Sequence, residues 1–132
     1  MNFMKKIYCL LFVLILAGCS KNGDVNPNDL KVTYNLSANA IGEFSINYTD
    51  PTNNSNQGVS LTGKSWSKSY TVSNVKSYPN GSVFNFNLSA ISYTAGENYT
   101  LSITANNHVV VTSTYSAVYN EGAIGYKYVV SH

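Results

Sequence analysis

The sequence is short of charge. Its 132 residues include no arginine, eight lysines and six acidic residues, so charged side chains make up only 11% of the chain. Asn, Ser and Thr together number 45, and 11 residues are tyrosine, so the chain is polar without being charged. Nucleic-acid binding needs a dense patch of Lys and Arg against the phosphates, and this composition excludes it as an expected function. The length fits one small domain.

Cysteine is equally scarce, and both copies lie within the first 19 residues. Lys5 and Lys6 precede an apolar run of 11 residues, 7–17. This run is shorter than the roughly 20 residues that a membrane-spanning helix needs. A charged start, a short apolar middle and small residues at the end are typical of a secretory signal.

The apolar run ends in Leu16-Ala17-Gly18-Cys19, which resembles the bacterial lipobox at every position. The resemblance implies a signal peptide over residues 1–18 and a diacylglyceryl-modified Cys19, which becomes the first residue of the mature chain and carries acyl chains such as palmitate. The alternative is a plain signal peptide whose cysteine has no role. Cys9 leaves with the signal peptide, so no free thiol remains for a disulfide, a zinc site or thiol redox chemistry.

The mature chain, residues 19–132, would hold six lysines and six acidic residues, so its side chains carry no net charge. A neutral surface gives no electrostatic steering toward a charged partner. Lipoproteins with Ser after the lipidated cysteine tend to be sorted to the outer membrane, and Ser20 implies that destination by resemblance. The periplasmic and the surface face both stay open.

Residues 19–30 have no apolar periodicity and many turn formers, which predicts a flexible tether. From Lys31 onward apolar and polar residues alternate with period two, as in strands with one buried face. The pattern predicts about seven strands, near residues 31–36, 43–49, 66–72, 84–90, 99–105, 109–115 and 124–130, with a short extra strand at 59–61 as an option. No segment of the mature chain has a useful helical stripe.

Turn formers separate these runs. Pro79-Asn80-Gly81 predicts a tight turn, and Asn106-Asn107 predicts a two-residue hairpin turn because Asn tolerates positive φ. A polar loop is expected from Asp50 to Gly58. Seven short strands over residues 31–132 favour an all-β fold, an immunoglobulin-like antiparallel β-sandwich with Trp66 in its core. An up-and-down barrel is the competing architecture.

Several motifs occur in an order that resembles a known family. They are Tyr34, Ile46-Asn47-Tyr48-Thr49-Asp50, Trp66-Ser67-Lys68-Ser69-Tyr70, Phe86-Asn87-Leu88-Ser89-Ala90, and a hairpin from Leu101-Ser102-Ile103 to Val109-Val110. Over residues 31 to about 116 the chain resembles the β-sandwich domain of the mycobacterial membrane-protein-small family and its lipoprotein relatives. The resemblance implies an accessory role beside a large membrane exporter and no catalytic residues. This chain has a lipid anchor where the mycobacterial members have a transmembrane helix.

Residue types for catalysis are few. The only histidines are His108, beside a predicted turn, and His132, the last residue. Glu43, Glu97 and Glu121 lie far apart in the sequence, whereas acid–base catalysis needs paired groups in a pocket. Neither a nucleophile elbow nor a phosphate-binding glycine loop is present. We therefore expect no enzyme, no metal and no cofactor.

The tyrosines are the most informative side chains. Tyr78, Tyr93 and Tyr119 flank predicted turns and are expected to be exposed. Together with Asn80 they would form a site for a sugar, which stacks on rings and hydrogen-bonds to amides. Tyrosine is also simply a good strand former, and that explanation competes with a binding role.

The leading hypothesis is a non-catalytic, lipid-anchored lipoprotein of the cell envelope that acts as an interaction or accessory module. The alternative is a lipoprotein that binds a glycan or small ligand through its loop tyrosines, and an envelope enzyme ranks third. Clustering of Tyr78, Tyr93, Tyr119 and Asn80 would favour a glycan. An open strand edge or a bare apolar face would favour a protein partner.

Overall fold

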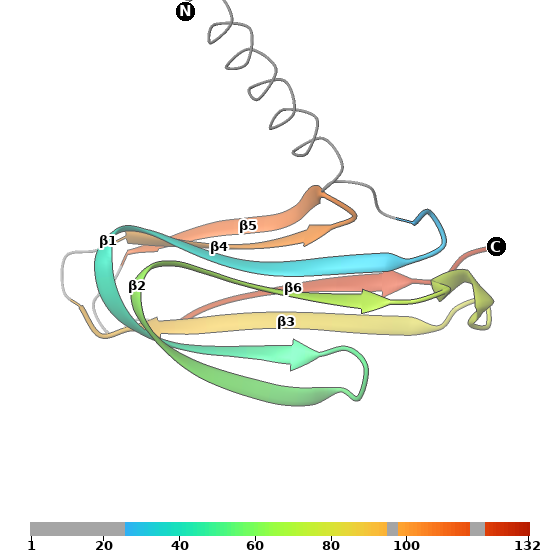
Figure 1. Ribbon diagram of the computed structural model, residues 1–132, viewed down its shortest axis with the longest axis horizontal. Helices are drawn as coiled ribbons and strands as arrows, with labels where there is room; N and C mark the ends of the chain where they lie inside the picture. Colours follow the sequence, from blue (N-terminus) through green and yellow to red (C-terminus); the bar gives the residue numbers. More distant parts are fainter. Residues whose placement is uncertain (1–25, 95–97, 117–120) are drawn as a thin grey trace, which may run out of the picture.

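The protein, as a computed structural model, is described over residues 26–94, 98–116 and 121–132. These residues form six strands: β1 (Leu30–Asp50), β2 (Ser55–Val72), β3 (Val83–Ser92), β4 (Asn98–Ala105), β5 (His108–Ser116) and β6 (Glu121–Val129) (Figure 1). The other described element is a single 3-10 turn, η1 (Val75–Ser77). All strand pairings are antiparallel. The predicted all-β class is confirmed.

Strand β1 organises the fold because it bends and belongs to both layers. Its first arm, residues 32–38, pairs with β4, and its second arm, residues 44–48, pairs with β3. Strand β2 follows β1 along both arms, and the register between them shifts between Ser37 and Gly42. An irregularity of this kind bends a strand and increases its twist. The small residues Ala38 and Ala40 occupy the bend.

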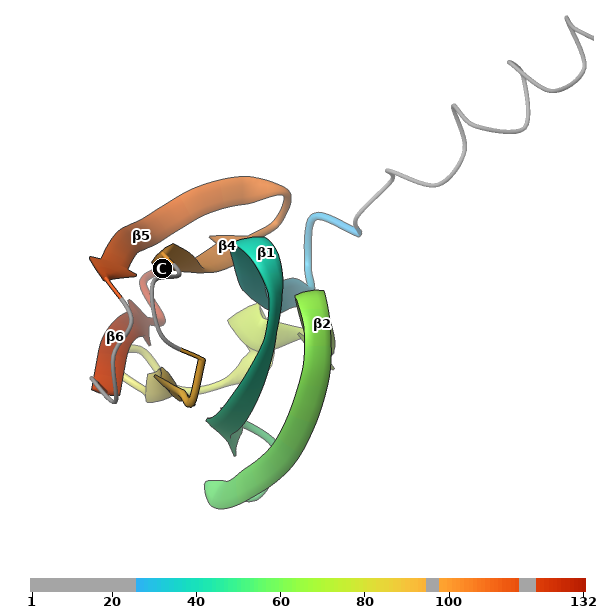
Figure 2. The same cartoon turned by 90° about the vertical axis from the view of Figure 1, so that its left-hand side faces the viewer.

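The strands therefore form two layers that share β1 and β2. The order is β5-β4-β1-β3-β6, with β2 paired to β1. The first layer contains β5, β4 and the first arm of β1, and the second contains the second arm of β1, β3 and β6. Seen from one end, the strands curl around a common interior (Figure 2). The sheet is nearly closed and sandwich-like.

The core lies between the layers and follows from the period-two pattern. Alternate residues of β1, β3 and β4 point inward, among them Tyr34, Ile46, Phe86 and Leu101, which are completely buried. The hydroxyl of Tyr34 donates to the carbonyl oxygen of Thr49 at 2.7 Å. A buried tyrosine needs such a partner, because an unpaired hydroxyl in the interior is costly.

The number of strands differs from the sequence-based expectation. The predicted runs at 31–36 and 43–49 are the two arms of β1, and those at 59–61 and 66–72 both lie in β2. The polar loop expected to end at Gly58 is shorter, because β2 begins at Ser55 and only residues 51–54 form the turn. The side chain of Asp50 accepts from the backbone N–H of Thr52 at 2.9 Å and tightens that turn.

Two predicted turns are confirmed. Asn106 and Asn107 have φ values of 47° and 68°, so both take the left-handed conformation of a two-residue hairpin turn. In the other turn, the N–H of Ser82 donates to the carbonyl oxygen of Pro79 at 3.0 Å, and Gly81 has a φ of 87°.

The ordered domain begins earlier than residue 31. Residues 26–30, assigned from the sequence to the tether, are attached to it. The N–H of Val75 donates to the carbonyl oxygen of Asn28 at 2.8 Å, and the N–H of Asn74 donates to the carboxylate of Asp29 at 2.9 Å. Leu30 is buried. Cys19 and the predicted signal peptide lie outside the described residues, and within the described ranges no helix has the length and apolarity to cross a membrane.

Candidate functional site

Hydrogen bonds gather several segments at one end of the domain, which we call the entry end. The side chain of Asn106 accepts from the N–H of Lys31 at 2.8 Å, which places the β4–β5 turn beside the start of β1. A ring nitrogen of His132 lies 3.0 Å from the carbonyl oxygen of Tyr78, which places the C-terminus there too. The opposite end, which holds the bend of β1 and the last residues of β3, is the far end (Figure 1).

The predicted tyrosine site is not assembled. Tyr78 and Asn80 lie at the entry end, just before β3, whereas Tyr93 follows β3 at the far end. The ten residues of β3 separate them by about 30 Å, at about 3.3 Å per residue. Tyr78 and Tyr93 are exposed, as expected, at 41% and 48%. Tyr119 lies outside the described residues.

The residues considered for acid–base chemistry are also dispersed. His108 begins β5 at the entry end, where His132 also lies, while Glu43 and Glu121 lie toward the far end. Glu97 lies outside the described residues. No group of three or more metal-ligating side chains occurs within the part of the chain that the structure describes.

The structure brings together a different set of aromatic residues, on the flank formed by β2. Because opposite residues of paired strands share a face, Trp66, Lys68 and Tyr70 of β2 lie on the same face as Leu36, Tyr34 and Val32 of β1, although Lys68 is exposed. Tyr48 from the other arm of β1 meets them: its ring centroid is 5.1 Å from that of Trp66 and 6.3 Å from that of Tyr70. We call Tyr48, Trp66 and Tyr70 the aromatic seam.

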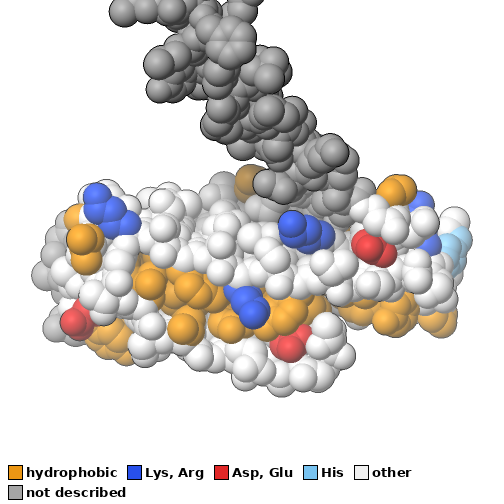
Figure 3. Space-filling view, in the orientation of Figure 1, with side chains coloured by type: hydrophobic (Ala, Val, Ile, Leu, Met, Phe, Trp, Pro, Cys, Tyr) orange, Lys and Arg blue, Asp and Glu red, His pale blue; other side chains and the backbone are white. Residues whose placement is uncertain are grey.

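The seam has a buried floor and a partly open rim. Tyr34 forms the floor, with its ring 5.8 Å from that of Tyr48 and no exposed surface. The three residues of the seam are only partly buried. Trp66, which the sequence predicted for the core, lies at this rim because its strand is at the edge of the sheet. In Figure 3 hydrophobic side chains run as a band along this side of the molecule, with lysine and acidic side chains beside it.

Two charged groups border the seam. The Nζ of Lys68 lies 5.5 Å from the centroid of the Tyr70 ring, within reach of a cation–π interaction. Burial raises the pKa of the Tyr70 hydroxyl above its ordinary value, and the carboxylate of Asp50 raises it further. Burial also raises the pKa of the Tyr34 hydroxyl, and Tyr70 and the Asp50 carboxylate raise it further. The seam therefore combines apolar rings, neutral hydroxyls and one charge of each sign.

The backbone beside the seam is also open. Strand β2 is 18 residues long and pairs along one side with β1. No other described strand pairs with its outer side. An unpaired edge presents a row of N–H and C=O groups to which another strand can bond. Lys64 and Lys68 are spaced along this edge, and lysine at an edge discourages uncontrolled pairing.

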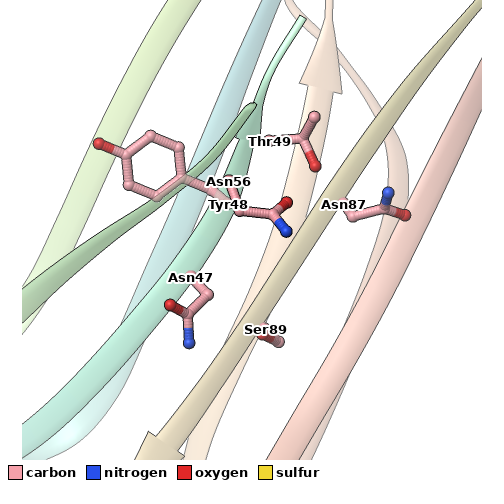
Figure 4. Close-up of a pocket in the computed structure, with 6 residues that line it drawn as sticks. All are labelled: Asn47, Tyr48, Thr49, Asn56, Asn87 and Ser89. Atoms are coloured by element: carbon pink, nitrogen blue, oxygen red, sulfur yellow. The ribbon is translucent and has the colours of Figure 1, made fainter. Parts of the chain in front are cut away.

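A second feature lies on the outer face of the second layer. Asn47, Asn56 and Asn87, with Thr49 and Ser89, line a shallow cavity of about 180 Å³. These amides and hydroxyls come from β1, β2 and β3, and in Figure 4 the Tyr48 ring points away from them. Gly125 lies opposite Asn87, and a Cβ there would come within 3.0 Å of the Asn87 amide oxygen. The glycine thus leaves room for the amide, although no aromatic ring provides a stacking surface.

A third feature is a cavity of about 390 Å³ near the entry end, lined on one side by the β1–β2 turn and on the other by Tyr78, Val83 and Phe84. Tyr78 stands nearly perpendicular to Phe84, with ring centroids 5.0 Å apart. Thr52, Asn54 and Ser73 add polar groups to the wall. Among the described residues, Tyr78 of the predicted ligand-binding set lines this cavity.

No protein-family model matches the chain, and no curated protein is similar to it at a significant level. The seam could have been suspected from the sequence, because Trp66, Lys68 and Tyr70 alternate on one face. Tyr48 could not have been added, since only the bend of β1 brings it to the same flank.

Proposed function

We propose that the protein is a lipid-anchored, non-catalytic lipoprotein of the cell envelope that binds an extended segment of another envelope protein along the outer edge of β2. Cys19 carries the acyl chains, and Ser20 directs the protein to the outer membrane. The observation that carries the binding role is the coincidence of an unpaired edge, 18 residues long, with the aromatic seam behind it.

The chemistry of this flank defines the partner. A segment that adds to β2 as a further strand would bond through its backbone, and every second side chain would point into the seam. Apolar or aromatic side chains at alternate positions would cover Trp66 and Tyr70. The anchor supplies the local concentration at the membrane, so a modest affinity suffices for capture. The resemblance to the mycobacterial family makes an exporter subunit the first partner to examine.

Site-specific cross-linking in cells tests the edge. A photoreactive residue replaces Ser67, which is exposed on β2, and as a control Asn85, which is exposed on the outer face of β3. We expect a discrete adduct with an envelope protein from position 67 and none from position 85. Trp66→Ala should reduce the yield at position 67 at least several-fold. Equal adducts from both positions would show that β2 is not the binding edge.

The anchor has a separate test. Cys19→Ala should give an unprocessed precursor that incorporates no labelled palmitate. Incorporation of label into this variant would show that Cys19 is not the acylated residue, whatever the cross-linking experiment shows.

The cavity beside Tyr78 supports a second candidate, the binding of a glycan. An exposed ring next to amide and hydroxyl groups suits stacking and hydrogen bonding to a sugar. A glycan array with the wild-type protein, Tyr78→Ala and Tyr93→Ala tests whether a glycan binds through Tyr78. Binding that is lost only in Tyr78→Ala would support it, and an array without any retained glycan would remove it.

A further inference from the structure

The exposed apolar side chains of the domain are unevenly distributed between its ends. Seven large hydrophobic residues are exposed within the described ranges. Ile41 and Tyr93 lie at the far end. The other five lie at the entry end, on the β4–β5 hairpin, the terminal β3–β6 pair and the connection from β2 to β3: Tyr78, Val83, Val109, Val110 and Val129.

The charged residues are also unevenly distributed between the two ends. Lys31, Lys76 and Lys127 lie toward the entry end, with Asp29 and Asp50 as the acidic residues of that end. Both carboxylates accept hydrogen bonds from neighbouring backbone N–H groups. The far end has the reverse balance, because Glu43 and Glu121 outnumber Lys64. Figure 3 shows lysine, histidine and hydrophobic side chains gathered at its right-hand end, which is the entry end.

The chain also enters the domain at this end. Asn26 is the first described residue, and only residues 20–25 separate it from Cys19. Seven Cα–Cα steps span at most about 25 Å, even when fully extended. If Cys19 is acylated, the entry end is therefore held within that distance of the membrane, whereas the far end, about 30 Å from the entry end along β3, is not held so closely.

We propose that the entry end rests on the surface of the bilayer, with its exposed valines and Tyr78 at the headgroup level and its lysines against anionic phospholipids. This inference rests on the proposed acylation of Cys19. Apolar side chains enter the boundary between headgroups and acyl chains, tyrosine is favoured at that depth, and lysine is attracted by anionic lipid. The sandwich then stands on its end, and the β2 edge faces sideways, where a membrane-bound partner can reach it.

The test uses the full lipoprotein in vesicles of phosphatidylcholine and phosphatidylglycerol. Because the mature chain has no other free thiol, an environment-sensitive fluorophore can be attached to Val109→Cys at the entry end and to Ile41→Cys at the far end. The two native side chains are equally exposed, at 64% and 65%, so the positions form a matched pair. Nitroxide-labelled lipids quench only a fluorophore that touches the bilayer.

We expect quenching at position 109 to be at least several-fold stronger than at position 41. The double substitution Lys76→Glu and Lys127→Glu should weaken it. Equal quenching at the two positions would overturn the inference, even for a protein that floats with the vesicles, and would leave the anchor intact. A protein that does not float would overturn the anchor and the inference together. Quenching at position 109 that is unchanged by the lysine substitutions would show that Lys76 and Lys127 do not contact the bilayer.

Discussion

The two flanks of the sandwich use tyrosine in opposite ways. On one flank β5 of the first layer is joined to β6 of the second by Tyr115. Its ring stacks on Tyr99 with centroids 5.6 Å apart, and its hydroxyl donates to the carbonyl oxygen of Ala123 at 2.8 Å. On the other flank, Tyr48 and Tyr70 line a seam beside the unpaired outer edge of β2. On the first flank a tyrosine links the last strands of the two layers, whereas on the second the rings lie beside an open edge.

The contact of Tyr115 with β6 depends on a glycine. A Cβ on Gly122 would lie 2.5 Å from the ring of Tyr115, so the ring can cross to β6 only because that side chain is absent. On the β2 flank the two arms of β1 are joined by Tyr34, whose hydroxyl donates to the carbonyl oxygen of Thr49, while Lys68 stays exposed beside the rings. The fit of Tyr115 against Gly122 thus covers the β5–β6 flank, whereas the β2 flank keeps an open edge beside its aromatic rings, where we expect a partner strand to add.

The largest expected effect comes from filling the gap on the closed flank. Gly122→Ala forces the Tyr115 ring to move and should lower the free energy of unfolding by about 1–3 kcal/mol, the usual cost of overpacking. Urea unfolding of the mature chain carrying Cys19→Ala measures it. The matched control is Gly63→Ala on β2, where a Cβ would lie 3.6 Å from the nearest Leu61 atom, an ordinary contact. The control should change stability by less than about 0.5 kcal/mol. Equal losses of unfolding free energy in both variants would show that the contact of Gly122 with Tyr115 does not limit the size of residue 122.

Alkaline pH should produce the next effect. Burial raises the pKa of Tyr34, Tyr70, Tyr99 and Tyr126 in the folded chain. Ionisation then favours the unfolded chain, so the stabilisation is complete below about pH 10 and is lost as the pH rises beyond it. Asp50→Asn removes a negative charge that raises the pKa of Tyr34 and Tyr70, so this variant should lose less stability in alkali. Urea unfolding at about pH 8 and about pH 11 checks both expectations. An unfolding midpoint that does not change between them would contradict the assignment.

The smallest effect on stability should come from Lys68. Lys68→Val removes an exposed cation–π interaction and adds an apolar side chain to the seam, so the net change should stay within about 0.5 kcal/mol. Its consequence should appear in self-association instead, because the lysine charge no longer protects the β2 edge. Sedimentation velocity should show dimers or larger species for this variant. Lys127→Val, on the outer face of β6, is the control and should stay closer to wild type.

The sequence predicted what depends on neighbouring residues. Period-two alternation was enough for the all-β class, and Asn106-Asn107 was enough for a hairpin turn. The continuity of β1 was not predictable. Residues 37–42 interrupt the alternation, and such an interruption is expected both for a turn between two strands and for a bend within one strand. Only the pairing with β2 along both arms distinguishes the two cases. The predicted tyrosine site was wrong for the same reason. The exposure of Tyr78 and Tyr93 follows from the turns beside them, but the distance between them depends on the direction of β3.

The place of β1 has a mechanical consequence. If Cys19 is acylated and a partner binds the β2 edge, as proposed, a moving partner pulls the domain between its anchor and this edge. The pull from the anchor then reaches the described chain at Asn26, four residues before β1 begins at Leu30. This strand is bonded along both sides, to β2 on one and to β4 and β3 on the other. A force along its axis must shear many backbone hydrogen bonds at once instead of opening them one by one. The proposed anchor would thus pull on the strand best able to bear tension, and β2, which would hold the partner, lies directly beside it.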